Sequence, residues 1–295
     1  MASPKPVLVA IDLVEDFEPT LREAAAYAPP GAPLLICHVL PDIGDSRAEL
    51  PLTRVSNAAE RVALEKMVEQ HIDDVARLAG VKPAAIEIER GVPYVRVVEL
   101  AKRRKVGLVV AGEPSSPEGW FAGTAERIVR YARCPVLVAR GERSGPVVVG
   151  TDLSDPSLPA IRAGAELARR SGVGLVVLHV IDAPKVWSTL SAIASSVAAT
   201  APVPIDEELL RRAAEDALRS TLASLAKDAT PEVAVGRPEQ VITRRAAELG
   251  AAAIVVGTRG RTGFGRVMIG SVAEAVVRTA PCSVLVVRQR GARRR

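Results

Sequence analysis

Short apolar runs alternate with longer amphipathic stretches along the chain. In the second half, runs of Val, Ile, Leu and Ala predict strands near 147–152, 175–181, 233–235, 252–256 and 283–287. The stretches between them predict helices near 157–171, 206–227, 238–249 and 271–279. Pro156 and Pro238 stand where a helix accepts a proline, in its first turn. In the 206–227 stretch, Leu and Ala recur at three- or four-residue steps, which gives that helix one apolar face.

The first half of the chain repeats this plan, with helices near 58–79, 94–105 and 123–133. Four blocks of the first half match blocks of the second half: 7–13 with 147–153, 34–39 with 175–180, 91–93 with 236–238, and 134–140 with 282–288. The matched blocks are 140 to 148 residues apart, which is too long a period for a solenoid. The pattern therefore predicts a duplicated domain, joined near the polar Gly/Pro stretch 141–146.

Continuous apolar strands that alternate with helices are typical of a parallel sheet covered on both faces. Right-handed crossovers then make each domain doubly wound. We therefore expect an α/β protein of two tandem Rossmann-like domains, 1–142 and 143–295. Each domain should hold a five-stranded parallel sheet flanked by about four helices.

Composition narrows the class of protein. The 295 residues are 48% apolar and 25% charged, an ordinary globular balance, but only 3% aromatic, which leaves few platforms for stacking nucleic-acid bases. The net charge is +5, and five arginines lie in the tail 288–295, so we expect no nucleic-acid partner. The three cysteines form no CxxC pair, which favours buried reduced thiols and a cytoplasmic protein. No apolar run approaches about 18 residues, so no membrane partner is expected.

A glycine-rich loop, 257–271, joins the fourth strand of the second half to the following helix. Glycines let backbone N–H groups approach a phosphate closely, and the helix start adds a positive field. Arg259, Arg261 and Arg266 add cationic charge. The alternative is a flexible connector before a helix capped by Ser271 and Glu274 as a capping box.

Asp152 ends the first strand of the second half. In doubly wound sheets, ligands bind beyond the carboxyl ends of the strands, where the strand order reverses. If the first and fourth strands are neighbours there, Asp152 faces the glycine loop, and a carboxylate opposite a phosphate cradle indicates a nucleotide. Alternatively, Asp152 only caps the next turn or helix, and Ser154 and Asp155 are other candidates for that cap. His38 and His179 lie at matched positions in apolar strands, so we interpret them as packed core residues; we expect no catalytic residue and no metal ligand.

The spacing of this loop, Gly-x2-Gly-x9-Gly-Ser, resembles that of ATP-binding members of the universal stress protein family. The resemblance covers essentially the whole chain, as two tandem domains. It implies that Asp152 and the backbone around Val180 hold adenosine, that Gly257 lies at the ribose, and that the loop and helix start bind the phosphates. The expected ATP-binding residues are Thr151, Asp152, Val180, Gly257, Arg259, Gly260, Arg261, Gly270, Ser271 and Val272.

The corresponding loop of the first half, 112–124, departs from the family pattern. Ser115 replaces the second glycine, and only seven residues separate it from Gly123. Pro114 and Pro117 remove two N–H donors, and the glutamates at 113 and 118 add negative charge where a phosphate would lie. Asp12 is kept, but we expect the first half to bind ATP poorly or not at all.

The resemblance implies an ATP-binding regulator of the stress response, with ATP, alone or with Mg²⁺, held in the second domain. The sequence has no P-loop, no Gly-x-Ser-x-Gly elbow and no kinase signature, so binding without fast turnover is the more economical interpretation, with weak ATP hydrolysis at most. The expected partners are the adenine nucleotide, a second copy in a homodimer and an unknown protein client.

Two other functions stay open. One is a slow ATPase or nucleotidyl-transferring enzyme in which Asp152 and Ser271 hold a metal near the phosphates. The other is an interaction module that binds no nucleotide. The ATP pyrophosphatase branch is disfavoured, because 151–155 reads Thr-Asp-Leu-Ser-Asp where that branch shows Ser-Gly-Gly-x-Asp-Ser. The long segment 184–204 is either a small amphipathic helix over the crevice or a surface loop.

Overall fold

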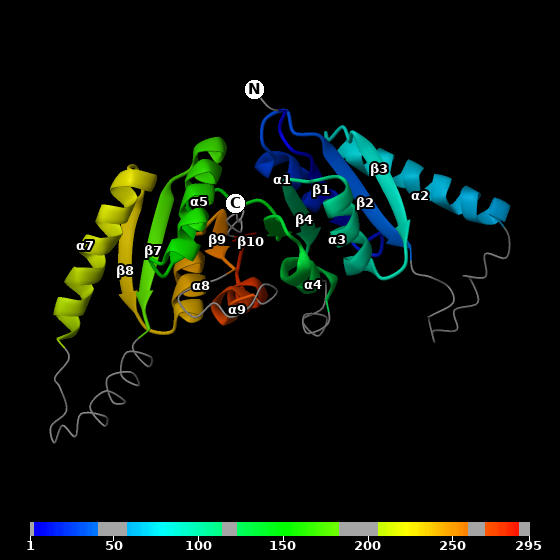
Figure 1. Cartoon of the computed structure of the whole chain (residues 1–295). Helices are drawn as coiled ribbons and strands as arrows, with labels where there is room; N and C mark the ends of the chain where they lie inside the picture. The colour runs from blue at the N-terminus through cyan, green and yellow to red at the C-terminus, as the bar shows by residue number, and fades with distance from the viewer. Residues whose placement is uncertain (1–2, 41–57, 114–122, 183–205, 259–268, 289–295) are drawn as a thin grey trace, which may run out of the picture. The chain divides into compact units, whose positions relative to one another are not determined.

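The computed structural model describes residues 3–40, 58–113, 123–182, 206–258 and 269–288 (Figure 1). The chain divides into two units, Met1–Glu142 and Arg143–Arg295, within the 141–146 stretch of the sequence. The 184–204 segment and the basic tail beyond Arg288 lie outside the described residues.

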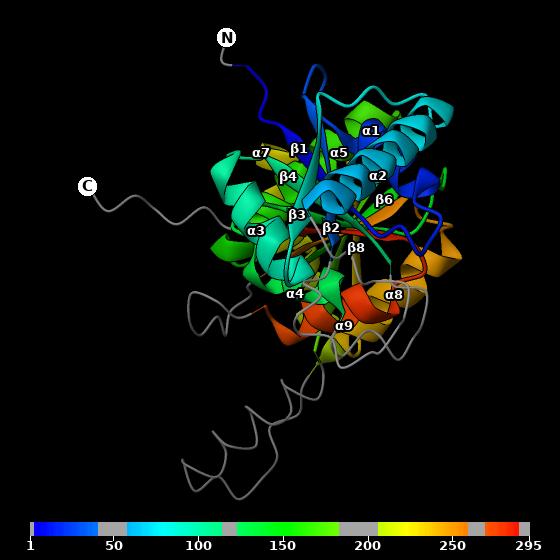
Figure 2. The ribbon, with the colours of Figure 1, turned by 90° about the vertical axis from the view of Figure 1, so that its right-hand side faces the viewer.

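The first unit is a five-stranded parallel sheet with helices on both faces. Its strands lie in the order β3-β2-β1-β4-β5. Helices α1 and α2 cover one face, and α3 and α4 cover the other (Figure 2). Helix α1 was not predicted in the sequence analysis. The bounds are β1 (Val7–Ile11), α1 (Glu18–Tyr27), β2 (Leu34–Leu40), α2 (Ala58–Leu78), β3 (Ala85–Arg90), α3 (Pro93–Arg103), β4 (Leu108–Gly112), α4 (Thr124–Tyr131) and β5 (Val136–Ala139).

The second unit repeats the first, with the strand order β10-β9-β6-β7-β8, again parallel. A 3₁₀ turn, η3 (Asp155–Ser157), precedes its first helix. The bounds are β6 (Val147–Thr151), α5 (Leu158–Ser171), β7 (Leu175–Ile181), α7 (Glu207–Leu225), β8 (Thr230–Val235), α8 (Pro238–Glu248), β9 (Ala253–Gly257), α9 (Ser271–Thr279) and β10 (Ser283–Val287). The expected doubly wound α/β architecture is confirmed.

The strand order of each unit reverses beside its first strand. β1 pairs with both β2 and β4, and β6 pairs with both β7 and β9. Gly150, near the end of β6, lies opposite Val256 near the end of β9. The neighbourhood expected from the sequence is thus confirmed, and the carboxyl ends of β6 and β9 meet at one edge of the sheet.

Small residues let the helices of the second unit approach its sheet closely. Gly164 in α5 faces β6, where a Cβ added to it would lie 2.2 Å from Cγ2 of Val149. Gly150 in β6 faces α8, where an added Cβ would lie 2.7 Å from Cδ1 of Ile242. The first strand of this unit is therefore packed tightly on both sides, which fixes the position of the residues at its end.

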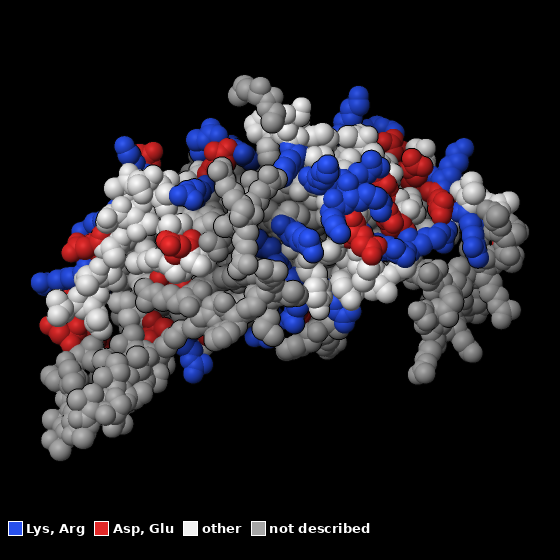
Figure 3. All heavy atoms as spheres, viewed as in Figure 1, with Lys and Arg blue, Asp and Glu red and all other residues white. Residues whose placement is uncertain are grey.

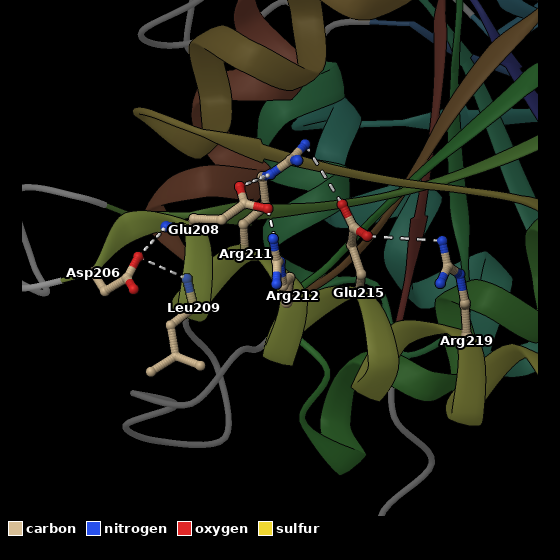
Figure 4. Close-up of polar contacts among 7 residues, drawn as sticks. All are labelled: Asp206, Glu208, Leu209, Arg211, Arg212, Glu215 and Arg219. Carbon is tan, nitrogen blue, oxygen red and sulfur yellow. Dashed lines mark hydrogen bonds and ion pairs between the residues drawn. The ribbon is translucent and has the colours of Figure 1, made fainter.

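The apolar face of α7 is buried only in its later part. Leu218 and Leu222 are buried, whereas Leu210 is 38% exposed and Leu209 is 64% exposed. The first turns are instead stabilised locally, because Oδ1 of Asp206 accepts from the backbone N–H groups of residues 208 and 209 at 3.0 and 3.1 Å (Figure 4). Exposed ion pairs follow along the helix, each of them weak: Glu208 with Arg211 and Arg212, and Glu215 with Arg211 and Arg219.

Two expectations from the sequence need correction. β8 begins at Thr230, three residues before the predicted start. Thr230 and Pro231 are exposed, so they do not belong to the apolar run from which the strand was predicted. They lie in the last strand of the sheet order, where proline is tolerated. Cys134 is only half-buried, although Cys37 and Cys282 are buried as expected. All three cysteines lie in the described part of the chain, and none forms a disulfide. Burial raises the pKa of the Cys37 thiol to about 12, and the nearby carboxylate of Glu89 adds to that rise.

Within the described residues, the structure contains no helix with the length and apolar character needed to cross a bilayer.

Candidate functional site

The turn after β6 is built by hydrogen bonds among its own side chains. Oγ1 of Thr151 lies 2.9 Å from Oγ of Ser157 and accepts from the N–H of Leu153 at 3.1 Å. Oδ1 of Asp152 accepts from the N–H and the Oγ of Ser154, at 3.1 and 2.5 Å. Leu153 has a φ of +61°, so the turn holds a strained left-handed residue. Asp152 therefore caps this turn, as the alternative interpretation held, and the turn fixes its carboxylate at the edge next to β9.

The first unit has a related turn after β1, where Oδ1 of Asp12 accepts from the N–H of Val14 at 3.1 Å. The carboxylate at the end of the first strand thus orders the following loop in both repeats.

The two histidines have matched structural contacts. Nδ1 of His38 lies 3.2 Å from the carbonyl oxygen of Ile11, and Nδ1 of His179 lies 2.9 Å from that of Thr151. A carbonyl only accepts, so Nδ1 carries the proton in both rings. Each histidine therefore links the second strand of its unit to the end of the first. Val180, which follows His179 in β7, is buried.

Helix α9 begins on a glycine. Gly270 is its N-cap, with φ −67° and ψ 146°, and it has no side chain to cap the first turn. Ser271 is already the first helical residue, so the capping box expected as an alternative, Ser271 with Glu274, is wrong. The N–H of Gly270 donates to the carbonyl of Thr258 at 2.9 Å, and the N–H of Thr258 donates to the carbonyl of Val287 at 2.9 Å. These two bonds fix the helix start against the ends of β9 and β10.

The backbone itself does not require a glycine at position 270. Its φ is one that any residue adopts, and an added Cβ would lie 3.4 Å from the carbonyl oxygen of Thr258, an ordinary contact. Ser, Thr, Asp or Asn is the usual residue at an N-cap, because its side chain satisfies the first-turn N–H groups. With Gly270 in that place, no N-cap side chain takes up the N–H groups of Ser271 and Val272, which are then suited to a ligand.

The structure brings most of the expected ATP-binding residues to one edge of the second unit. Thr151 and Asp152 lie at the end of β6, Gly257 at the end of β9, and Gly270 at the start of α9. Val180 lies near the end of β7, and Ser271 and Val272 form the first turn of α9. Arg259, Gly260, Arg261 and Arg266 lie outside the described residues.

The first unit contains a cavity at the same edge. It has a volume of about 500 Å³ and lies at the carboxyl ends of β1, β2, β4 and β5. Glu113, expected to repel phosphate, instead pairs with Arg140, whose Nε lies 2.8 Å from Glu113 Oε1 and whose side chain is 3% exposed. α4 also starts on a glycine without a capping side chain, Gly123. Pro114, Ser115, Pro117 and Glu118 lie outside the described residues, so weak ATP binding by this unit stays a prediction.

Sequence reasoning missed two residues of this cavity, Thr20 and Arg140. An alignment of the two repeats could have drawn attention to each of them. Thr20 differs from its equivalent in the second repeat, Ala160. Arg140 is the last residue of the block 134–140, which matches 282–288.

Basic side chains on the described surface lie close to acidic ones. Over α3 and β3, blue and red residues adjoin in Figure 3. Arg103 pairs with Glu89 at 2.5 Å, and that hydrogen bond raises the pKa of the Arg103 side chain. Arg104 pairs with Glu87 in the same way. Such pairing weakens the positive field over this surface.

Comparison with known proteins identifies relatives along both units. A model of the universal stress protein family matches residues 4–140 and 144–288. A universal stress protein of Mycobacterium tuberculosis is 29% identical over 232 residues, which cover 74% of this chain and 73% of the relative. The crystal structure of a universal stress protein from Archaeoglobus fulgidus covers 97% of both chains, with a TM-score of 0.64 and 17% identity, a similarity of fold. Another from Archaeoglobus fulgidus, solved in complex with dAMP, is 21% identical over 46% of this chain and 97% of its own, with a TM-score of 0.34.

The family model covers nearly the whole of both units, and the fold is the one expected for two tandem copies. The chain therefore belongs to the universal stress protein family, with one family domain in each unit.

Proposed function

We propose that this protein is a nucleotide-responsive stress regulator that binds ATP in its second unit. One observation carries the proposal: α9 begins on Gly270, which has no capping side chain and whose N–H bonds to Thr258 just beyond β9, the neighbour of β6. The proposed role combines a phosphate site on α9 with a nucleoside site on β6 and β7.

The phosphate end of the site rests on the first turn of α9. The N–H groups of Ser271 and Val272 point out of the helix start, where the helix dipole favours an anion. Because the N-cap is a glycine, no side-chain oxygen competes with a phosphate oxygen for these donors. Arg259 and Arg261, in the loop before α9, add positive charge to the same segment of sequence.

The nucleoside end rests on the turn after β6. Asp152 is held by Ser154 at the end of β6, and neighbouring strands of a sheet lie about 4.8 Å apart. A ligand with its phosphates on α9 can therefore extend past β9 to this carboxylate. A carboxylate accepts hydrogen bonds from ribose hydroxyl or adenine amino groups, and the backbone around Val180 adds a second wall.

We expect binding to dominate over turnover. The nearest histidine, His179, has its Nδ1 bonded to the carbonyl of Thr151, which holds the ring in the sheet. The described residues hold no cluster of three metal-ligating side chains. A Mg²⁺ ion accompanying ATP would therefore be held mainly by the phosphates, with Asp152 after β6 and Glu274 in the first turn of α9 as acidic side chains of the same edge.

Isothermal titration of the full chain with ATP tests this proposal, and the repeat supplies a matched control. We expect one site per chain. Gly270→Val places a branched side chain at the start of α9, where it obstructs the phosphates and should weaken ATP binding at least tenfold, equal to about 1.4 kcal/mol. Gly123→Val makes the same change at the start of α4 and should leave ATP affinity unchanged.

Three results would contradict the proposal. Two ATP sites per chain would place nucleotide in the first unit as well. No titration signal would favour the interaction module. Steady ATP hydrolysis that Asp152→Ala abolishes while ATP still binds would favour the enzyme. The proposal also includes a homodimer of tandem chains, which light scattering in solution would detect as twice the chain mass.

A further inference from the structure

The cavity of the first unit presents different chemistry from a phosphate site. Its volume of about 500 Å³ falls within the range of small-molecule pockets. Much of its wall is apolar, formed by Phe17, Val39, Val97 and Ile128 among others. These walls can bury the body of a small organic ligand.

Two buried polar side chains line this cavity, and one atom of each has no partner among the described residues. His38 is 8% exposed and Thr20 is 9% exposed. Because Nδ1 of His38 donates to the carbonyl of Ile11, the neutral ring offers Nε2 as an acceptor. Within the described part of the chain, neither Nε2 of His38 nor Oγ1 of Thr20 has a hydrogen-bond partner. Both side chains are more than nine-tenths buried and line the cavity, so a ligand with donor groups inside it can reach these two atoms.

The charge of the cavity lining is negative. Asp12, Glu15, Asp16 and Glu113 contribute four carboxylates, and Arg140 contributes one guanidinium that is already paired with Glu113. These four carboxylates and one guanidinium sum to a net charge of three negative. Such a field repels phosphate and attracts cations.

The second repeat keeps Asp12 and His38, as Asp152 and His179, but it differs from the cavity lining at other equivalent positions. Asp16 is equivalent to Pro156, Phe17 to Ser157, and Thr20 to Ala160, all in ungapped continuation of the matched first strands. Glu113, which follows β4, is equivalent to Thr258, which follows β9. At these four positions of the cavity, the first unit therefore has acidic, hydroxyl or aromatic residues where the second unit has small or neutral ones.

We propose that this cavity binds an organic cation, namely a phosphate-free amine on an apolar body. Donor groups of the amine satisfy Nε2 of His38 and Oγ1 of Thr20. The field of the carboxylates stabilises its positive charge, and the apolar walls hold its body. This site lies in the first unit, so the proposal can be tested independently of ATP binding by the second unit.

A pair of probes with the same body and opposite charge tests the proposal. Tryptamine carries an ammonium group on an indole, and indole-3-propionate carries a carboxylate on the same indole. In isothermal titration of the full chain with saturating ATP present, tryptamine should bind one per chain with a dissociation constant in the millimolar range or tighter. Indole-3-propionate should bind at least tenfold more weakly.

Three variants assign the binding to this cavity. Thr20→Ala installs the residue of the second repeat and should weaken tryptamine binding roughly two- to tenfold, because it removes one buried hydrogen bond. Asp16→Asn should weaken it roughly two- to fivefold, with less effect at high salt, because Asp16 is exposed. Asp216→Asn, an exposed carboxylate on α7, is the charge-matched control and should change nothing.

The proposal is overturned if tryptamine gives no heat or chemical-shift change at 5 mM, about the upper end of the expected range. It is equally overturned if both indoles bind alike, or if Thr20→Ala leaves the affinity unchanged while its circular dichroism shows a folded chain. ATP displacing tryptamine from the chain would also contradict it, since that would place phosphate in the acidic cavity.

Discussion

Replacing Gly164 by alanine tests how tightly α5 is packed against β6, the strand that carries Asp152. An alanine Cβ at this position would lie 2.2 Å from Cγ2 of Val149. Ordinary contact begins at 3.4 Å, so the helix and strand must separate by about 1.2 Å, or Val149 must leave its rotamer. Val149 is fully buried, so neither movement is easy.

The expected cost follows from two opposing effects. Overpacking of a close-packed core costs about 1 to 3 kcal/mol, and a required shift of this size lies toward the upper end. Exchanging glycine for alanine within a helix returns up to about 1 kcal/mol through helix propensity. The net loss should be about 1 to 2 kcal/mol in the free energy of opening the second unit.

Hydrogen–deuterium exchange of the full chain measures this loss unit by unit. Peptides from β6 and β9 should exchange about five- to thirtyfold faster in Gly164→Ala, the factor that 1 to 2 kcal/mol implies. Peptides from β1 and β4 serve as an internal control, because they belong to the first unit.

A second substitution decides whether the clash is the cause. Val149→Ala alone should destabilise, because it leaves a cavity. Combined with Gly164→Ala, it removes the clashing methyl group, so the double variant should lose at least about 1 kcal/mol less than the sum of the singles. Strict additivity, or a Gly164→Ala chain as stable as the parent, would refute the packing argument.

Four further predictions concern other parts of the chain. Asp206→Ala removes the acceptor of two N–H groups at the start of α7, so hydrogen–deuterium exchange across 207–213 should become faster, by the factor that a loss of about 1 kcal/mol in local stability implies. Asp206→Asn should exchange almost like the parent chain. Equal exchange rates in the two variants would contradict this prediction. Iodoacetamide at pH 8 should modify Cys134 first and leave Cys37 and Cys282 protected, as read by peptide mass spectrometry. The raised pKa of the Cys37 thiol should also make stability fall as pH rises from about 9 toward 12, because only the unfolded chain then loses that proton; Cys37→Ala should flatten this slope. Ser115→Val should leave ATP affinity and stoichiometry unchanged, and weaker titration with ATP would show that the first unit contributes to the site.

The parts of the fold that follow from local pattern were predictable from the sequence. The apolar strand runs and the repeated blocks indicated parallel doubly wound domains, and the reversal of strand order placed Asp152 beside β9. Pro238 marked the first turn of α8. These features depend on periodicity and chain topology, which a single sequence records.

The features that were missed depend on tertiary contacts. The start of α9 at Ser271 was predicted, but the alternative capping box was wrong; the bond from the Gly270 N–H to the Thr258 carbonyl is a tertiary contact that no capping motif encodes. The apolar face of α7 is exposed at Leu210. This exposure was not predicted, because the periodicity of a helix does not reveal where its packing partner ends. The pair of Glu113 and Arg140 joins residues 27 positions apart, so the charge of Glu113 looked unbalanced in the sequence.

Amide chemical shifts test most directly whether the start of α9 binds the phosphates. In two-dimensional ¹H–¹⁵N spectra of the deuterated chain, saturating ATP should shift the amides of Ser271 and Val272 strongly, with the proton moving downfield as it donates to a phosphate oxygen. The equivalent amides of Thr124 and Ala125, at the start of α4, should stay in place. Unmoved amides at 271 and 272 in the presence of bound ATP, or equal shifts at both helix starts, would contradict the account.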